Sequence, residues 1–152
     1  AFGVQPPSLY RHFASRAELL RAINLRTNEA VVEVLRAAAL EAPDEAGEGV
    51  LALLRAYRAF AQANPMSITL AYSALTPETR PDPAQLEALA LPLQAIMAQI
   101  SGEANALAAL RGAWALAHGF VMLELNGQFQ RGGDLDAAFD QAVRAYIAGW
   151  MR

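Results

Sequence analysis

The hydrophobic and polar residues of this chain alternate with a helical period along most of its length. Apolar positions recur three and four residues apart in long runs, and the strict alternation typical of a β-strand is almost absent. Glycine, proline and asparagine interrupt the runs at intervals. The predicted helices cover residues 16–40, 44–63, short pieces within 66–75, 83–100, 103–130 and 134–150, the last two joined through 131–133. The pattern therefore predicts an all-α bundle.

Each long helix carries an apolar stripe that is expected to face a common core. In 16–40 the stripe is Leu20, Ile23, Val31, Val34 and Leu35, in 44–63 it is Val50, Leu53, Leu54, Tyr57 and Phe60, and in 83–100 it is Leu86, Leu89, Leu93, Ile96 and Met97. Pro92 removes one backbone hydrogen bond from the middle of its helix, so a kink is expected there.

The amino-terminal residues combine an apolar side with a side rich in hydrogen-bonding groups. A helix predicted to begin at about Pro6 places Leu9 and Phe13 together on its apolar side. The polar residues of the same segment are Gln5, Ser8, Tyr10, Arg11 and His12. Their side chains are of the kinds that bind phosphates and base edges. The segment is therefore a candidate nucleic-acid reader.

This segment resembles the recognition helix of the TetR/AcrR family of transcriptional regulators, which commonly runs G-V-x-x-x-x-L-Y-x-H-F and then x-S-K-x-x-L. The matching residues are Gly3, Val4, Leu9, Tyr10, His12, Phe13, Ser15 and Leu19, and Arg16 replaces the usual lysine with its charge kept. The resemblance implies phosphate contacts by Tyr10, His12 and Arg16, and base contacts by Gln5, Ser8 and Arg11. It also implies two further helices upstream that complete a helix-turn-helix.

A second resemblance lies near the carboxyl end, in residues 114–129. Trp114, His118, Gly119 and the run Leu123-Glu124-Leu125 are similar to the W-H-G signature of one TetR C-terminal subfamily. Together the two motifs imply that residues 1–26 are the end of a DNA-binding domain running into a linking helix. Residues 27–152 are then expected to form an effector-binding and dimerisation domain within a TetR-like helical bundle.

The distribution of charge agrees with this division. The whole chain has a formal net charge of −3, but residues 1–26 contain four arginines and one glutamate, whereas the remainder contains eight arginines and fourteen acidic residues. The positive charge is thus concentrated in the segment that would approach DNA. Ser15 and Glu18 form a predicted capping box that begins the linking helix.

The last two helices carry more apolar surface than one small monomer is expected to bury. In 103–130 one apolar side, expected to face inward, is formed by Leu107, Leu110, Trp114, Val121 and Leu125, and a second by Leu116, Phe120 and Leu123. The helix 134–150 carries a row of small residues, Ala138, Ala142, Ala145 and Gly149. The family resemblance implies a homodimer in which these helices form a four-helix interface and place two readers on a palindromic operator. The alternative is that both stripes belong to the core of a monomer.

A ligand cavity is expected where large, adaptable side chains from several helices face inward. The candidates are Tyr57, Phe60, Met66, Tyr72, Met97, Trp114, His118 and Met122. For each of them the alternative is an ordinary core position, and for His118 a structural hydrogen bond. Glu124 is expected to be paired structurally. Because few charges fall on these stripes, the effector is expected to be small and hydrophobic.

The residue inventory argues against an enzyme. The chain has no cysteine, no lysine, no glycine-rich phosphate loop and no histidine–glutamate metal spacing, so neither a cofactor nor a metal is expected. The longest uncharged run, 59–77, is interrupted by polar residues, which predicts a cytoplasmic protein without a membrane segment. The prediction is a ligand-responsive regulator, and specifically a repressor. The alternative is a helical ligand-binding or protein-interaction module that does not bind DNA.

Overall fold

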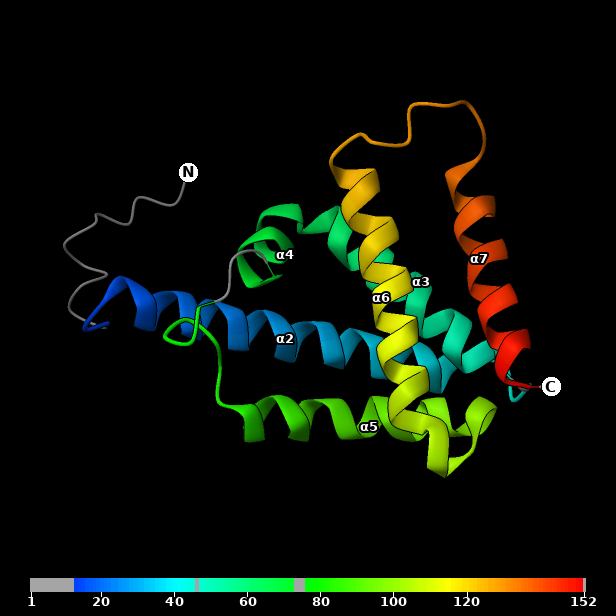
Figure 1. Ribbon diagram of the computed structural model, residues 1–152, viewed down its shortest axis with the longest axis horizontal. Helices are drawn as coiled ribbons and strands as arrows, with labels where there is room; N and C mark the ends of the chain where they lie inside the picture. Colours follow the sequence, from blue (N-terminus) through cyan, green and yellow to red (C-terminus); the bar gives the residue numbers. More distant parts are fainter. Residues whose placement is uncertain (1–12, 46, 73–75, 152) are drawn as a thin grey trace.

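The computed structural model describes residues 13–45, 47–72 and 76–151, and these residues form a bundle of α-helices without a strand. The elements are α2 (Arg16–Glu41), α3 (Glu48–Ala63), α4 (Pro65–Tyr72), α5 (Pro83–Ser101), the 3₁₀ helix η1 (Glu103–Asn105), α6 (Ala106–Leu125) and α7 (Leu135–Trp150). Figure 1 shows α2 and α5 running side by side, with α6 crossing the pair and α7 next to α6. The predicted fold class is confirmed.

Three of the helices, α2, α5 and α7, begin with a capping side chain. The Oγ atom of Ser15 accepts a hydrogen bond from the backbone N–H of Glu18 at 3.1 Å, and the Glu18 carboxylate accepts one from the backbone N–H of Ala14 at 2.6 Å. Ser15 therefore caps α2 as predicted, but Glu18 bonds to the residue before Ser15 and not to Ser15 itself, as it would in a capping box. Asp82 and Asp134 cap α5 and α7 in the same way, each accepting from backbone N–H groups of the first turn.

Two predicted helix boundaries are wrong because the local backbone conformation shortens the helix, once at its start and once at its end. The helix expected from residue 44 begins at Glu48, since Gly47 adopts a left-handed φ of 89°. The helix expected to reach residue 130 ends at Leu125 in a Schellman motif, in which Gln128 donates to the Leu123 carbonyl and Gly127 to the Glu124 carbonyl. The loop to α7 is therefore longer than predicted. By contrast, α5 continues through Pro92 to Ser101.

The fully buried face of α6 consists mainly of alanines, and Leu110, Trp114, Val121 and Leu125 of the predicted stripe pack in or against the core beside it. The residues of α6 that are buried are Ala106, Ala109, Ala113, Ala117 and Val121. Leu107, which was expected to face inward, is 43% exposed. Small side chains let α6 lie close to α3 and α5, so its large side chains lie on the flanks of the contact.

One polar cluster joins the ends of three helices. Arg58 of α3 has a side chain only 10% exposed and makes two hydrogen bonds to Glu124 of α6, at 2.8 and 2.7 Å. It also pairs with Asp136 of α7 at 2.7 Å, and its guanidinium lies over the rings of Phe120 and Phe139. The hydrogen bonds from Arg58 lower the pKa of Glu124, so the carboxylate is ionised. The structural interpretation of Glu124 is confirmed.

Substitution of this arginine should be far more costly than substitution of a neighbouring exposed one. Arg58→Ala leaves the largely buried Glu124 carboxylate without its cation, which should cost about 3 kcal/mol or more of unfolding free energy. Arg55→Ala removes the pair with Asp140, in which the arginine is 50% exposed, and should cost about 1 kcal/mol or less. Urea denaturation of both variants measures the difference, and equal losses would contradict it.

Candidate functional site

A cavity of about 560 Å³ lies between α2, α5 and α6, with one side chain from α4 at its wall. Its lining is mostly aliphatic. The residues that line it are Asn28, Val31, Val32, Tyr72, Leu86, Leu89, Ala90, Leu93, Leu107, Leu110, Arg111 and Trp114. Val31 and Leu93 are buried, whereas Leu107 and Arg111 are exposed at the opening. The cavity has the size and the composition of a small-molecule site.

A chain of hydrogen bonds links the wall of this cavity to α4. Tyr72 of α4 donates to Oδ1 of Asn28 at 2.9 Å, and Nδ2 of Asn28 donates to Oδ1 and the carbonyl of Asn24, one turn earlier on α2. The Asn24 amide in turn donates to the Ala71 carbonyl of α4. We call this set of bonds the α2–α4 ladder. It connects two helices at the point where both contribute to the site.

Four aromatic rings pack together beside the cavity. Trp114 and His118 are stacked, with ring centroids 5.7 Å apart and planes 7° apart, and Tyr57 and Tyr72 lie against Trp114 at 4.8 and 5.3 Å. The Tyr57 hydroxyl and Nδ1 of His118 are hydrogen-bonded at 2.7 Å. His118 therefore has a structural partner, and its partial burial lowers the pKa of the imidazole.

The structure brings only part of the predicted ligand set to the cavity. Tyr72 and Trp114 line it, and His118 supports Trp114 from behind. Tyr57 and Met97 have no exposed surface and pack in the hydrophobic core, so they occupy the ordinary core positions that were the alternative to a ligand-binding role. Met122 packs against that core.

The expectation for Met66 does not fit its position, because its side chain is 70% exposed. The short helix α4 turns Ile68 and Ala71 inward. Met66 precedes Ile68 by two residues, or about 200° of helix rotation, and so lies on the opposite side.

Similarly, Val34 of α2 is 39% exposed because the buried face of that helix is Asn24, Thr27, Val31 and Leu35.

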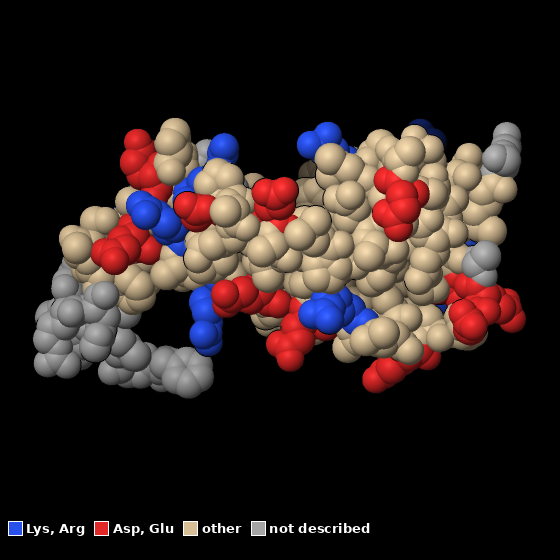
Figure 2. All heavy atoms as spheres, turned by 90° about the horizontal axis from the view of Figure 1, so that it is seen from below, with Lys and Arg blue, Asp and Glu red and all other residues tan. Residues whose placement is uncertain are grey.

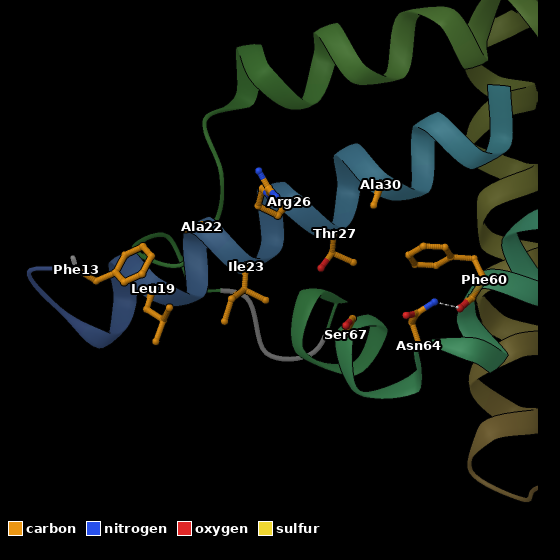
Figure 3. A pocket seen from close by; sticks show the side chains of 10 residues that line it. All are labelled: Phe13, Leu19, Ala22, Ile23, Arg26, Thr27, Ala30, Phe60, Asn64 and Ser67. Atoms are coloured by element: carbon orange, nitrogen blue, oxygen red, sulfur yellow. Dashed lines mark hydrogen bonds between the residues drawn. The ribbon is translucent and has the colours of Figure 1, made fainter. Parts of the chain in front are cut away.

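Phe60 lines a second cavity, of about 430 Å³, shown in Figure 3. Phe13, Leu19, Ile23 and Thr27 reach it from the start of α2, and Asn64 and Ser67 close it near α4. The Asn64 side chain donates to the Phe60 carbonyl at 2.9 Å. This cavity lies beside the first turns of α2, which follow the reader motif in the sequence.

Most of the predicted DNA contacts cannot be placed. Gln5, Ser8, Tyr10, Arg11 and His12 lie outside the described residues, whereas Arg16 is exposed as the first residue of α2. Figure 2 shows acidic and basic groups at intervals over one face, with wide uncharged areas between them. Among the described residues, no cluster of three His, Asp or Glu side chains suited to a metal ion occurs.

The residues predicted for the dimer lie on one partly exposed side of α6 and α7. Leu123 is 47% exposed. Ala138, Ala145 and Gly149 are also exposed, and Leu116, Phe120 and Ala142 are partly buried. Phe120 packs within the chain against Phe129 and Phe139, with ring centroids 4.8 and 5.1 Å away. Part of the predicted interface is thus already used in the monomer, and the rest is available to a partner.

Residues 103–125 have the length and apolar composition of a membrane-spanning helix, and 28% of the apolar window is buried within the structure. Helix α6, which makes up most of this stretch, packs against α3, α5 and α7 and carries the charged residues Arg111 and Glu124.

The two asparagines and Arg58 were missed by sequence reasoning. Asn24 is 2% exposed and Arg58 is 9% exposed, although both residue types are usually placed at the surface. The spacing of Asn24 and Asn28 by one helical turn was a usable signal, because polar pairs four residues apart interact on a helix. Nothing local indicated their partners on α4.

Comparisons with known proteins agree with this architecture. A family model described as the tetracyclin repressor-like C-terminal domain matches residues 50–146. An uncharacterized HTH-type transcriptional regulator of Mycobacterium tuberculosis, Rv0681, is 35% identical over 158 residues, covering 99% of this chain and 68% of that protein.

Two solved structures share the fold. A protein of unknown function from Rhodococcus sp. RHA1 superposes with a TM-score of 0.78 at 24% identity, over 99% of this chain and 80% of the other. The protein SCO4313, described as a suspected regulator, superposes with a TM-score of 0.71 at 25% identity, over 96% of this chain and 80% of the other.

Folding stability should depend on His118 in the mildly acidic range. Because its pKa in the folded protein lies below the unfolded value of about 6.5, the unfolded state binds the proton more readily. The unfolding free energy should therefore be at its maximum above about pH 6.5 and decrease as the pH falls towards about 5.5. Urea denaturation at several pH values should show this slope in the unmodified chain and a weaker slope in His118→Asn.

The matched comparison is His12→Asn, which removes the other of the two histidines. A His118→Asn variant whose stability varies with pH as strongly as that of the unmodified chain would contradict the assignment. Measurements stay above about pH 5.5, since ionised carboxylates such as Glu124 begin to lose their stabilising pairs at lower pH.

Proposed function

Because this chain belongs to the TetR family of transcriptional regulators, as its family-model match and its curated relative show, we propose that it is a ligand-responsive repressor. In this proposal, residues 1–26 contribute to operator binding, and residues 27–152 bind the effector and form a homodimer. The observation that carries it is the cavity between α2, α5 and α6, whose wall includes the helix that follows the reader motif. No catalytic role is proposed.

The length of α2 supports a mechanical link between the two parts. The helix is 26 residues long, which corresponds to about 39 Å. Asn28, Val31 and Val32 of α2 line the cavity, and Arg16 begins the same helix about 18 Å away. A shift of α2 at the cavity would therefore move the reader segment as well, since the helix is continuous between them.

The α2–α4 ladder is the element through which an effector would act. Asn28 and Tyr72 both line the cavity, and the bond between them holds α4 against α2. A ligand that displaces Tyr72 removes that bond and changes the relative stability of two arrangements of α2. Only such a difference in affinity between the two states can shift the population away from the DNA-binding form.

A homodimer supplies the second reader that a palindromic operator requires. The exposed side of α6 and α7, with Leu123 and the small residues Ala138, Ala145 and Gly149, supports a helix–helix interface of this kind. Small side chains allow close approach of two helices, and burial of exposed leucine surface is favourable at about 25 cal/mol per Å².

Operator binding is tested in a form of the protein that carries a complete helix-turn-helix. A duplex selected from a random library is the probe, and fluorescence anisotropy is recorded over a range of salt concentrations. Arg11→Ala, at a predicted base contact, and His12→Ala should weaken binding. Arg16→Ala should also lower the slope against salt by about 1, because it removes a charged phosphate contact, whereas Arg131→Ala should change neither quantity. Absence of salt-sensitive binding by the unmodified protein would favour the protein-interaction module instead.

Dimer formation is tested by sedimentation velocity at micromolar concentration. The unmodified chain should sediment as a dimer, and Leu123→Arg should shift it to the monomer because a charge would be buried at the interface. The control is Leu40→Arg, since Leu40 is 82% exposed and belongs to α2, which contributes none of the predicted interface residues. A monomeric unmodified chain would refute the interface.

A further inference from the structure

The polar groups around the cavity are not equally free to bind a ligand. Both N–H bonds of the Asn28 amide are used by Asn24, and the hydroxyl hydrogen of Tyr72 is used by Asn28. The two polar side chains from α2 and α4 therefore have their donors engaged within the protein. A ligand that needs a donor must find it elsewhere on the cavity wall.

Arg111 is the charged residue of the lining and meets this need. The ion pairs among the described residues involve Arg55, Arg58 and Arg144, so the Arg111 guanidinium is not neutralised by any of them. Its five N–H donors are held in a planar fork that fits a carboxylate. Arg111 lies one helical turn from Trp114, and this places it on the same side of α6 as the aromatic wall.

The cavity has an exposed end and a buried end, and this difference favours one orientation of such a ligand. Arg111 and Leu107 are exposed at the opening, whereas Val31 and Leu93 are buried at the inner end. Burial raises the pKa of the Tyr72 hydroxyl, which shows that negative charge is disfavoured at that wall. A charged head group would remain at the opening, and an apolar chain would extend inward.

We propose that the effector is an apolar carboxylate, whose tail fills the aliphatic cavity and whose carboxylate binds Arg111 at the opening. This inference rests on the proposed effector site and narrows the ligand from a hydrophobic molecule to an anionic amphiphile. Charge-assisted hydrogen bonds are stronger than neutral ones, so the head group contributes selectivity as well as orientation.

The test compares two probes of equal chain length, decanoate and decan-1-ol, by isothermal titration calorimetry below their aggregation limits. The unmodified chain should bind decanoate at least about tenfold more tightly than the alcohol. Arg111→Gln should remove that preference and leave the affinity for the alcohol within about twofold, because the aliphatic lining is unchanged. The control variant is Arg131→Gln, which removes the charge of an arginine in the loop that follows the carboxyl end of α6. It should leave both affinities unchanged.

The outcomes separate this inference from the function on which it rests. Equal binding of the two probes, or an Arg111→Gln variant that keeps the preference for decanoate, would overturn the carboxylate assignment and leave the cavity as a site for neutral ligands. Failure of both probes to bind would refute the effector site itself. Thermal unfolding followed by circular dichroism checks that Arg111→Gln is folded, as expected for an exposed side chain.

Discussion

The alanine face of α6 is the constraint on which the remaining arrangement depends. With Ala106, Ala109, Ala113 and Ala117 at the contact, α6 lies close to α3 and α5, and there is no room there for its larger residues. Trp114 and Leu110 are therefore directed to one flank, where they line the cavity, while Leu123 is left exposed on another. The small residues on one face of α6 thus account for both the cavity and the exposed apolar surface. A leucine in place of Ala113 would fill the contact and separate the helices, since overpacking a tight interface forces backbone shifts.

Polar interactions then fix how the helices are placed on this packed frame. Aliphatic contacts favour burial but are not directional, so they leave the rotation and sliding of neighbouring helices weakly specified. The Arg58 cluster fixes α3, α6 and α7 to one another at one end, through bonds whose geometry tolerates little displacement. The α2–α4 ladder does the same for the helices at the cavity. The two differ in accessibility: Arg58 is enclosed by Phe120 and Phe139, whereas Asn28 and Tyr72 border a space that a ligand can enter.

Local features of the sequence predicted local structure well. The existence and order of the helices, the Ser15 N-cap and the end of α3 at Asn64 all depend on neighbouring residues, and all were found. The predicted stripe of α6 was right for Leu110, Trp114, Val121 and Leu125, which pack in or against the core, and wrong for Leu107, which is exposed. The alanine face of α6 was missed because alanine gives a weak hydrophobic signal. Buried polar residues could not be found because their partners are distant: Asn24 and Ala71 are 47 residues apart, and Arg58 and Glu124 are 66 apart. The cavity was predicted only in part, since Tyr72 and Trp114 are large aromatics but its aliphatic wall resembles any core.

The position of the ladder bears on how a ligand could control the reader. A molecule that only filled the aliphatic space would contact α2, α5 and α6 but leave the hydrogen bonds to α4 unchanged. It would therefore stabilise any arrangement of α2 in which the cavity is open to it. A ligand controls the reader only if its binding breaks an interaction that is kept in the ligand-free state. The Tyr72–Asn28 bond is such an interaction, because it lies at the cavity wall and its loss leaves Asn28 with an unpaired acceptor in a half-buried position. The cost of that loss is comparable to a coupling free energy of about 1–3 kcal/mol, which corresponds to a change in affinity of roughly fivefold to 150-fold.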